Sequence, residues 1–281
     1  MNLTMKILIT GANGMLGHDL ASVLVDHELF LFDSKSLDIT DKNKVETEVG
    51  KVKPDIVINS AAFTDVDGCE SQYEAAYDVN ANGPRNLALV CKDLNIPLLH
   101  VSTDYVFKGD KNTPLVEDDP VGPKTAYGKT KLEGEEFIKE ILDDYYIIRT
   151  AWLYGHNGAN FVETMLSLAE NNTELNVVND QIGSPTFTYD LAVKIKEIIE
   201  SGKYGIYHVT NSGYCSWYDF ACEIFKLSNI NIKVNPVSTE EFPRPAIRPK
   251  YSVLSNKKLT DNGFKPLRNY VDALKKYLEE R

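Results

Sequence analysis

Tyr127 and Lys131 are the residues whose types and spacing most clearly suggest chemistry. Side chains four residues apart in a helix lie on one face, one turn above the other. A phenol is a poor acid at neutral pH, but a lysine ammonium held beside it favours the phenolate and lowers the phenol pKa. Such a pair can pass a proton to or from an alcohol or carbonyl oxygen. An isolated Tyr-x-x-x-Lys is more often a solvated surface pair, so the upstream residues must decide.

A glycine-rich segment near the start of the chain is the strongest upstream signal. The apolar run 6–10 is typical of a buried strand, and it leads through Gly11, Gly14 and Gly17 into a helix expected over 19–25. A tight turn, a close approach to a pyrophosphate and close helix packing would each require a glycine here. The helix N-terminus would supply N–H groups and a positive dipole end for the phosphates. The segment therefore predicts a dinucleotide site.

Acidic residues after the next strand bear on the choice of cofactor. Asp33 follows a strand expected over 28–32. A carboxylate there accepts hydrogen bonds from an adenosine ribose and repels a 2′-phosphate, which favours NADH. The following Ser34, Lys35 and Ser36 could instead hold a 2′-phosphate, so NADPH and NADH both stay open. Asp38 is equally consistent with an adenosine contact and with a helix cap.

Strands and helices continue to alternate as far as residue 150. Strands are expected over 55–59, 97–101 and 145–149, with helices over 70–78, 84–94 and 127–142. This alternation predicts a parallel sheet with right-handed crossovers. After the strand at 97–101, Thr103 could bond a substrate oxygen, and Asp104 could bind substrate hydroxyls or cap a turn.

The expected fold class is α/β: a Rossmann-type doubly wound parallel sheet with a smaller α/β C-terminal substrate lobe. Residues 1–150 would form the NAD(P)-binding domain, to which 187–210 return, and 151–186 with 211–281 would form the substrate-binding lobe. The proline-rich segment 242–249 carries Arg244 and Arg248, which could grip a diphosphate or could be solvated charges on a rigid connector.

Composition excludes several classes of function. The 281 residues carry a net charge of −11 with no basic run, which argues against a nucleic-acid surface. No apolar run of membrane-spanning length occurs, so no membrane partner is expected. The four cysteines lack Cys-x-x-Cys spacing, which indicates free thiols in a reducing compartment. Because the N-terminal stretch has no apolar leader pattern, a cytoplasmic location is expected.

A series of motifs runs along almost the whole chain: Gly11-x-x-Gly14-x-x-Gly17, Asp38-Ile39, Asn59-Ser-Ala-Ala-Phe-Thr, Ser102-Thr-Asp-Tyr-Val-Phe, Tyr127-x-x-x-Lys131, Arg149-Thr-Ala-Trp-Leu-Tyr, Gln181-Ile-Gly-Ser-Pro-Thr and Arg248-Pro. In this order they resemble the extended short-chain dehydrogenase/reductases, and within them most closely the dTDP-4-dehydrorhamnose reductases. The glycine loop and Tyr-x-x-x-Lys mark only the superfamily, whereas the motifs at 102, 149 and 181 are more specific.

The resemblance implies roles for individual positions. The cofactor-binding set is then Gly11, Gly14, Met15, Leu16, Gly17, Asp33, Asp38, Ile39, Ala62, Phe63, Thr64, Tyr127 and Lys131. The catalytic residues would be Thr103, Tyr127 and Lys131, and the substrate contacts would be Thr103, Asp104, Trp152 and Arg248.

The implied reaction is NAD(P)H-dependent reduction of the C4 ketone of dTDP-4-dehydro-6-deoxy-L-mannose to dTDP-L-rhamnose. Tyr127 would donate the proton, Lys131 would lower the tyrosine pKa and hold the nicotinamide ribose, and Thr103 would fix the carbonyl oxygen. Some bacterial members dimerise through magnesium bound by glutamates. Asp19 is the residue at the corresponding point here, so no metal is predicted and a homodimer stays open.

Three alternatives stay open at this point. An epimerase or dehydratase of the same superfamily would keep its cofactor tightly bound and turn over without added NAD(P)H. A protein like the regulatory subunit of methionine adenosyltransferase would bind a partner and would co-purify with a synthetase. A cofactor-binding domain without sugar chemistry is the third.

Overall fold

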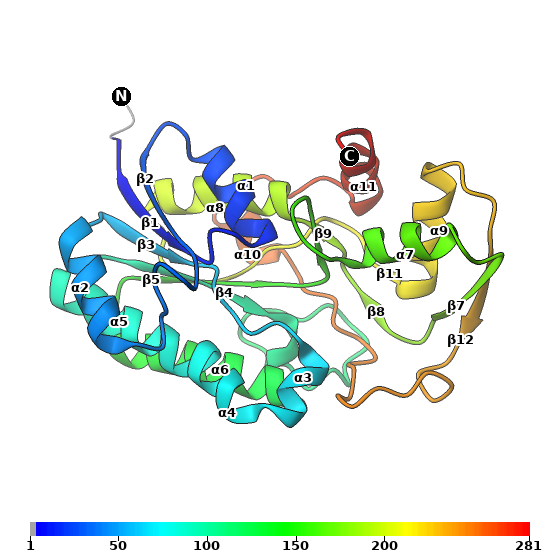
Figure 1. Cartoon of the computed structure of the whole chain (residues 1–281), viewed down its shortest axis with the longest axis horizontal. Coiled ribbons are helices and arrows are strands. Elements are labelled where there is room, and N and C mark those ends of the chain that lie inside the picture. The colour runs from blue at the N-terminus through cyan, green and yellow to red at the C-terminus, as the bar shows by residue number, and fades with distance from the viewer. Residues whose placement is uncertain (1–3) are drawn as a thin grey trace.

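Six parallel strands form the central sheet of the protein (Figure 1). The computed structural model describes residues 4–281. Residues 1–3 lie outside this range; they belong to the N-terminal stretch on which the expected cytoplasmic location is based. The strands, in their order across the sheet, are β10 (Gly205–His208), β5 (Tyr145–Thr150), β4 (Leu98–Thr103), β3 (Ile56–Asn59), β1 (Lys6–Thr10) and β2 (Glu28–Phe32). The direction of strand order reverses between β1 and β3, which is where a doubly wound sheet opens its ligand crevice.

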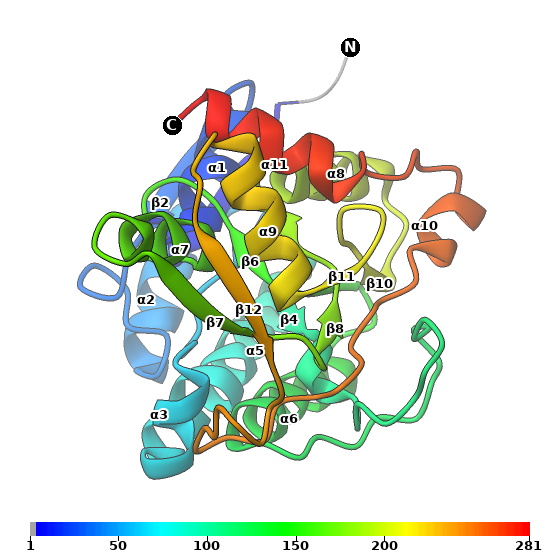
Figure 2. The ribbon, with the colours of Figure 1, turned by 90° about the vertical axis from the view of Figure 1, so that its right-hand side faces the viewer.

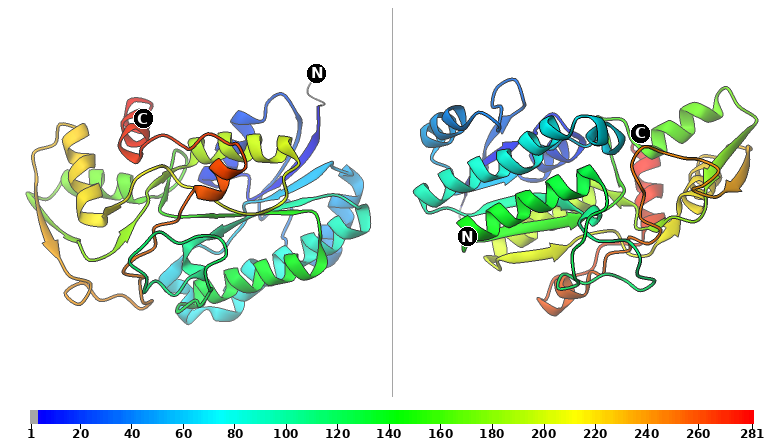
Figure 3. Two further views of the ribbon diagram at one scale, coloured as in Figure 1. Left: turned by 180° about the vertical axis from the view of Figure 1, so that it is seen from behind. Right: turned by 90° about the horizontal axis from the view of Figure 1, so that it is seen from below.

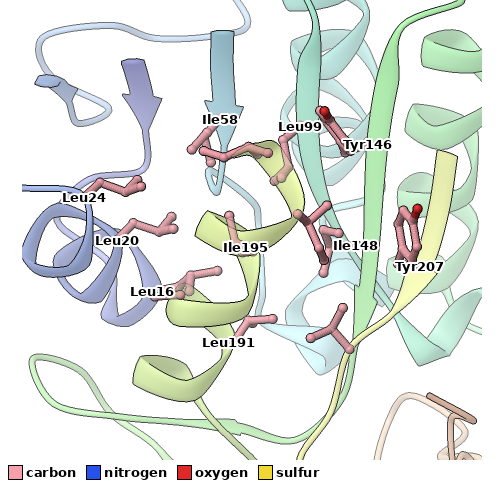
Figure 4. Close-up of a cluster of buried hydrophobic side chains, with 14 of the residues drawn as sticks. Leu16, Leu20, Leu24, Ile58, Leu99, Tyr146, Ile148, Leu191, Ile195 and Tyr207 are labelled. Atoms are coloured by element: carbon pink, nitrogen blue, oxygen red, sulfur yellow. The ribbon is translucent and has the colours of Figure 1, made fainter. Parts of the chain in front are cut away.

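Helices cover both faces of this sheet, because its strands are apolar on both sides. On one face lie α1 (Met15–Val23), α8 (Thr188–Ser201) and α10 (Lys257–Asp261). Leu16, Leu20, Leu191 and Ile195 of this layer pack on strand residues such as Ile148 (Figure 4). The other face is covered by α2 (Lys42–Val52), α5 (Gly83–Leu94) and α6 (Ala126–Ile141), which run beneath the sheet (Figure 3). The doubly wound fold class is therefore confirmed.

A second, smaller group of elements lies beside the carboxyl ends of the strands (Figure 2). Its helices are α7 (Phe161–Ala169), α9 (Trp217–Leu227) and α11 (Tyr270–Glu279). Its short strand pairs are β7 (Glu174–Val178) with β12 (Lys233–Val237), β8 (Ile182–Gly183) with β11 (Cys215–Ser216), and β6 (Leu153–Tyr154) with β9 (Thr186–Phe187). An aromatic core of Tyr154, Phe187, Phe220 and Tyr277 holds this group together.

Two expected helices differ from the structure. The first helix begins at Met15 rather than residue 19, because Gly14 adopts the extended conformation of an N-cap and the helical backbone starts directly after it. The helix expected over 70–78 is interrupted at Gln72, whose backbone leaves the helical region, and forms α3 (Val66–Ser71) and α4 (Tyr73–Tyr77). A π-helical turn over Asp78–Asn82 then leads into α5. Within the described residues, no helix has the length and apolar character needed to cross a membrane.

Candidate active site

Thr103 and Tyr127 meet where the carboxyl end of β4 approaches the first turn of α6, and Lys131 follows one turn later on the same helix. Thr103 is the last residue of β4, and Tyr127 is the second residue of α6. The helix begins there because Thr125 is its N-cap, with the hydroxyl accepting a hydrogen bond from Gly128 N at 3.0 Å. The Glu70 carboxylate accepts a second bond, from Ala126 N at 2.9 Å. Two side chains thus position the helical turn that carries the phenol.

The Tyr127 phenol lies in an apolar setting. Its ring meets Tyr105 edge-on, with 5.5 Å between ring centroids, and packs near Cys69 and Ala126. Burial raises the pKa of the phenol, and the neighbouring Thr103 hydroxyl opposes that rise. At neutral pH the phenol therefore carries its proton, as a proton donor must.

Asp104 is almost completely buried beside Thr103. Its Oδ1 accepts a hydrogen bond from the Thr103 hydroxyl at 2.9 Å, while Oδ2 makes none with the described residues. Burial raises the pKa of this carboxyl to about 6, against the opposing effect of the Ser252 and Thr103 hydroxyls. An unpartnered buried carboxylate oxygen at this position is suited to receive a substrate hydroxyl.

Lys131 points towards β4 rather than towards the phenol. Its Nζ lies 3.0 Å from His100 Nε2 and donates to the carbonyl oxygen of Val101 at 2.7 Å. Burial lowers the pKa of this lysine to about 7, partly offset by Glu135. The structure thus does not show the expected lowering of the Tyr127 pKa by Lys131; burial governs both groups.

The glycine loop, called the glycine cradle below, packs so closely on neighbouring backbone that a side chain at Gly11 or Gly17 would collide with it. Gly11 has φ of +71°, and a Cβ there would lie 2.6 Å from Ala61 N. A Cβ on Gly17 would lie 2.4 Å from Gly11 O. Gly14, the N-cap of α1, brings no side chain to the helix N-terminus. The first N–H groups of α1 therefore face this cradle without a capping side chain, which suits a pyrophosphate.

Asp33 and Asp38 both organise turns. Asp33 accepts a hydrogen bond from Asn13 Nδ2 at 2.7 Å and others from the hydroxyl and backbone of Ser36. The bonds from Ser36 are the main cause of its lowered pKa. Asp38 Oδ1 accepts from the backbone and hydroxyl of Thr40 at 3.0 and 2.8 Å. Asp33 is half-buried and Asp38 is exposed, and Oδ2 of each carboxylate keeps a free lone pair for a ribose hydroxyl.

Three expected cofactor residues have packing roles in the structure. Leu16 and Ile39 are buried in the two sheet cores, so only their backbone can reach a ligand. Met15 lies against the loop after β6, where its sulfur is 3.8 Å from Asn160 Nδ2.

The segment Ala62, Phe63 and Thr64 continues from β3 along the crevice. Asn80 holds it in place: its Oδ1 accepts from Phe63 N at 2.8 Å, and its Nδ2 donates to Phe63 O at 3.1 Å. The same amide lies 3.2 Å from the Thr130 hydroxyl of α6. Asn80 thereby joins the expected cofactor segment to the helix of Tyr127 and Lys131.

Trp152 adopts a backbone conformation that is rare for a side chain of its size, with φ of +48°. Its indole stacks on Trp217 of α9, with centroids 3.5 Å apart, and packs against Gly183. Strain of this kind is retained where the surroundings fix it, often at ligand sites. Trp152 thus marks the junction between the sheet and the smaller lobe.

Arg248 lies near Tyr105 in the wall of a surface cavity. Its guanidinium donates to Asp67 Oδ2 at 3.0 Å, and Arg244 lies 3.9 Å from the same oxygen. This cavity has a volume of about 510 Å³, with Tyr105, Thr125 and Tyr251 also in its wall. Lys124 and Lys250 also line this cavity, which makes its surface basic in an acidic protein.

Comparisons with known proteins show the family to which the chain belongs. The family model described as the RmlD substrate binding domain matches residues 5–281. The chain belongs to this family. A curated relative, the spore coat polysaccharide biosynthesis protein SpsK of Bacillus subtilis, is 48% identical over 98% of both chains.

Two solved structures superpose over nearly the whole chain. A dTDP-4-dehydrorhamnose reductase of Clostridium acetobutylicum is 50% identical with a TM-score of 0.97, covering 98% of this chain and 99% of its own. The dTDP-4-dehydrorhamnose reductase of Bacillus anthracis, solved in complex with NADP, is 43% identical with a TM-score of 0.97, covering 99% and 100%. The family fold, including both sheet and smaller lobe, is thus shared from end to end.

Sequence reasoning missed several residues that shape this RmlD-family site. Glu135 and Arg149 form a buried two-pronged ion pair, with the closest contact 2.7 Å, that ties α6 to β5. Asn80 and Glu70 hold the turns on either side of Tyr127. A charged pair 14 residues apart, or an amide between two helices, shows no local pattern, so only the fold reveals such contacts. Glu135 did offer a sequence signal, because it lies two turns after Tyr127 on the same helix and therefore on the same face as the phenol.

Proposed function

We propose that the protein reduces the C4 ketone of dTDP-4-dehydro-6-deoxy-L-mannose to dTDP-L-rhamnose, with NADPH or NADH as reductant. The observation that supports this function is the placement of Thr103 beside Tyr127 on α6, one turn before Lys131, in a chain of the RmlD family that also carries the glycine loop. A dTDP-4-dehydrorhamnose reductase that is 43% identical was solved in complex with NADP.

The cradle at Gly11 and Gly17, the uncapped N-terminus of α1 and the free lone pair of Asp33 Oδ2 fit a nicotinamide dinucleotide. When bound, it supplies the hydride. Tyr127 donates its phenolic proton to the substrate oxygen as negative charge develops there, so hydride and proton together give the alcohol. The Thr103 hydroxyl has a single proton, which it donates to Asp104 Oδ1 here. In the proposed reaction this proton turns to the substrate oxygen and orients it, and Asp104 Oδ2 accepts a sugar hydroxyl.

Further residues complete the proposed arrangement. Trp152 packs against the sugar nucleotide, and Arg248 offers its guanidinium to the diphosphate. We also propose the division into a cofactor part, 1–150 with 187–210, and a substrate lobe, 151–186 with 211–281. We also propose a cytoplasmic location and a homodimer. Analytical ultracentrifugation of the purified protein tests whether it is a dimer.

Replacing Tyr127 by Phe tests the proton donor. The ring and its packing stay while the acid is lost, so kcat should fall by about 10²–10⁴-fold. The measurement is the substrate-dependent oxidation of NADPH, then NADH, followed by absorbance, with enzymatically generated dTDP-4-dehydro-L-rhamnose. Tyr105→Phe is the matched control, because it removes a neighbouring phenol and should leave kcat within a few-fold. Wild-type turnover in Tyr127→Phe would remove Tyr127 from this role.

A further inference from the structure

His100 is a fully buried histidine on β4 that links two parts of the candidate site. Its Nδ1 lies 3.0 Å from Asn59 Nδ2 at the end of β3, and its Nε2 lies 3.0 Å from Lys131 Nζ on α6. Burial lowers the pKa of this imidazole well below its ordinary value, so the ring is neutral. A neutral imidazole carries one ring proton, and the neighbours decide which nitrogen holds it.

The orientation of Asn59 decides the position of that proton. Asn59 Oδ1 accepts a hydrogen bond from Ala61 N at 3.1 Å and from the Thr10 hydroxyl at 2.7 Å. Because a backbone N–H can only donate, the amide oxygen must face Ala61 and the amide NH₂ must face His100. His100 Nδ1 is then an acceptor, and the ring proton is on Nε2.

The proton on Nε2 points at Lys131. An ammonium group has only donors, so a charged Lys131 would oppose the Nε2–H at 3.0 Å. A neutral amine accepts that proton with its lone pair and still donates to Val101 O at 2.7 Å. The bond chain Ala61–Asn59–His100–Lys131 is therefore fully satisfied only when Lys131 is uncharged.

We propose that His100 is a positioning residue that holds Lys131 as a neutral amine in the cofactor-free enzyme. The charged groups around Lys131 are consistent with this state. Glu135, one turn further along α6, favours a charged lysine, but its carboxylate is paired with Arg149 of β5. Tyr127 lies one turn before, β3 contributes the amide of Asn59, and β4 contributes His100 and the Val101 carbonyl. Burial independently lowers the pKa of Lys131 to about 7.

This state has a consequence for catalysis, which rests on the proposed reduction. The Tyr127–Lys131 pair is inactive until Lys131 gains a proton. A neutral amine does not favour the phenolate, and Tyr127 keeps its raised pKa. Catalysis that needs the ammonium should therefore decline as pH rises through the pKa of Lys131. His100 sets that pKa low by stabilising the neutral form with its Nε2–H.

The first test is the ring ¹⁵N spectrum of the five histidines in cofactor-free protein, which distinguishes the two tautomers. His100 should be the Nε2–H tautomer. His208 is the internal reference of opposite type, because its Nδ1 lies 3.1 Å from the Leu115 carbonyl and must donate, while burial lowers its pKa to about 3. His100→Gln assigns the signal; if that variant does not fold, replacing the other four histidines assigns it by exclusion. An Nδ1–H or doubly protonated His100 overturns the inference.

The second test is the pH profile of kcat/KM for NADPH, which reports groups of the free enzyme. In His100→Gln, the amide oxygen of the new side chain can accept a hydrogen bond from the Lys131 ammonium. In Asn59→Asp, the new carboxylate only accepts, so the His100 ring proton moves to Nδ1 and Nε2 can accept from Lys131. Both should shift the alkaline limb upward by about one pH unit or more. If the alkaline limb of the kcat/KM profile is unshifted in both variants and both are folded, His100 does not hold Lys131 neutral. The ¹⁵N spectrum needs no substrate, so a protein with the expected tautomer but no turnover would refute only the proposed function.

Discussion

At the scale of single residues, burial sets the charge of the candidate site more than neighbouring charges do. Asp104 shows this most clearly, because burial raises its pKa from 3.8 to about 6. The folded protein then binds a proton between these two values that the unfolded chain has released. Stability therefore falls as pH rises through this window, by about 3 kcal/mol for a shift of about two units.

Asp104→Asn should remove this dependence. Its free energy of unfolding relative to wild type should increase between pH 4 and pH 7 by up to about 3 kcal/mol, because the amide has no charge to bury. Urea unfolding of both proteins at the two pH values measures the difference. Asp93→Asn, on the exposed side of α5, is the matched control and should show no such change. A constant difference between Asp104→Asn and wild type would contradict the raised pKa.

At the scale of elements, the parts of the site that depend on local pattern were predictable, and the contacts between elements were not. The strand at 6–10, the glycine cradle and the helix of Tyr127 follow from apolar periodicity and turn chemistry. The direction of Lys131 does not, because its partners His100 and Val101 belong to a strand 30 residues earlier. Likewise, the positive φ of Trp152 has no signal in its residue type.

The N-cap of α6 gives a prediction at this scale. Thr125→Val keeps the shape but removes the hydroxyl that accepts from Gly128 N, so the free energy of unfolding should fall by about 1–2 kcal/mol. Tyr127 lies two residues further on, and kcat should fall with it while the cofactor dissociation constant stays unchanged. Thr125→Ser keeps the hydroxyl and should stay close to wild type in urea unfolding and steady-state kinetics. Equal stability of the two variants would mean that Glu70 alone caps this helix.

At the scale of the whole molecule, the doubly wound sheet was predictable because alternating strands and helices admit few topologies. The contact between α3 and the proline-rich segment 242–249 was not predictable, because it joins residues far apart in the chain. Asp67 of α3 accepts from Ala246 N at 3.1 Å and from Arg248 at 3.0 Å, 181 positions later. Figures 1 and 2 both show this C-terminal segment lying beside α3. The arginines expected to meet a diphosphate thus lie against an acidic residue that is distant in the sequence.

Asp67→Asn tests whether this tie serves the substrate side of the protein. The isosteric amide can still accept from Ala246 N but loses the charge that holds Arg248, an exchange worth about 1 kcal/mol for a partly exposed pair. KM for the dTDP-sugar should rise by about fivefold, with the dissociation constant for NADPH unchanged. Lys257→Met is the matched control, since it breaks an exposed ion pair with Asp261 on α10 and should alter neither constant. If both constants rise together in Asp67→Asn, α3 acts on the cofactor crevice through Phe63 and Thr64, and the tie does not serve the substrate alone.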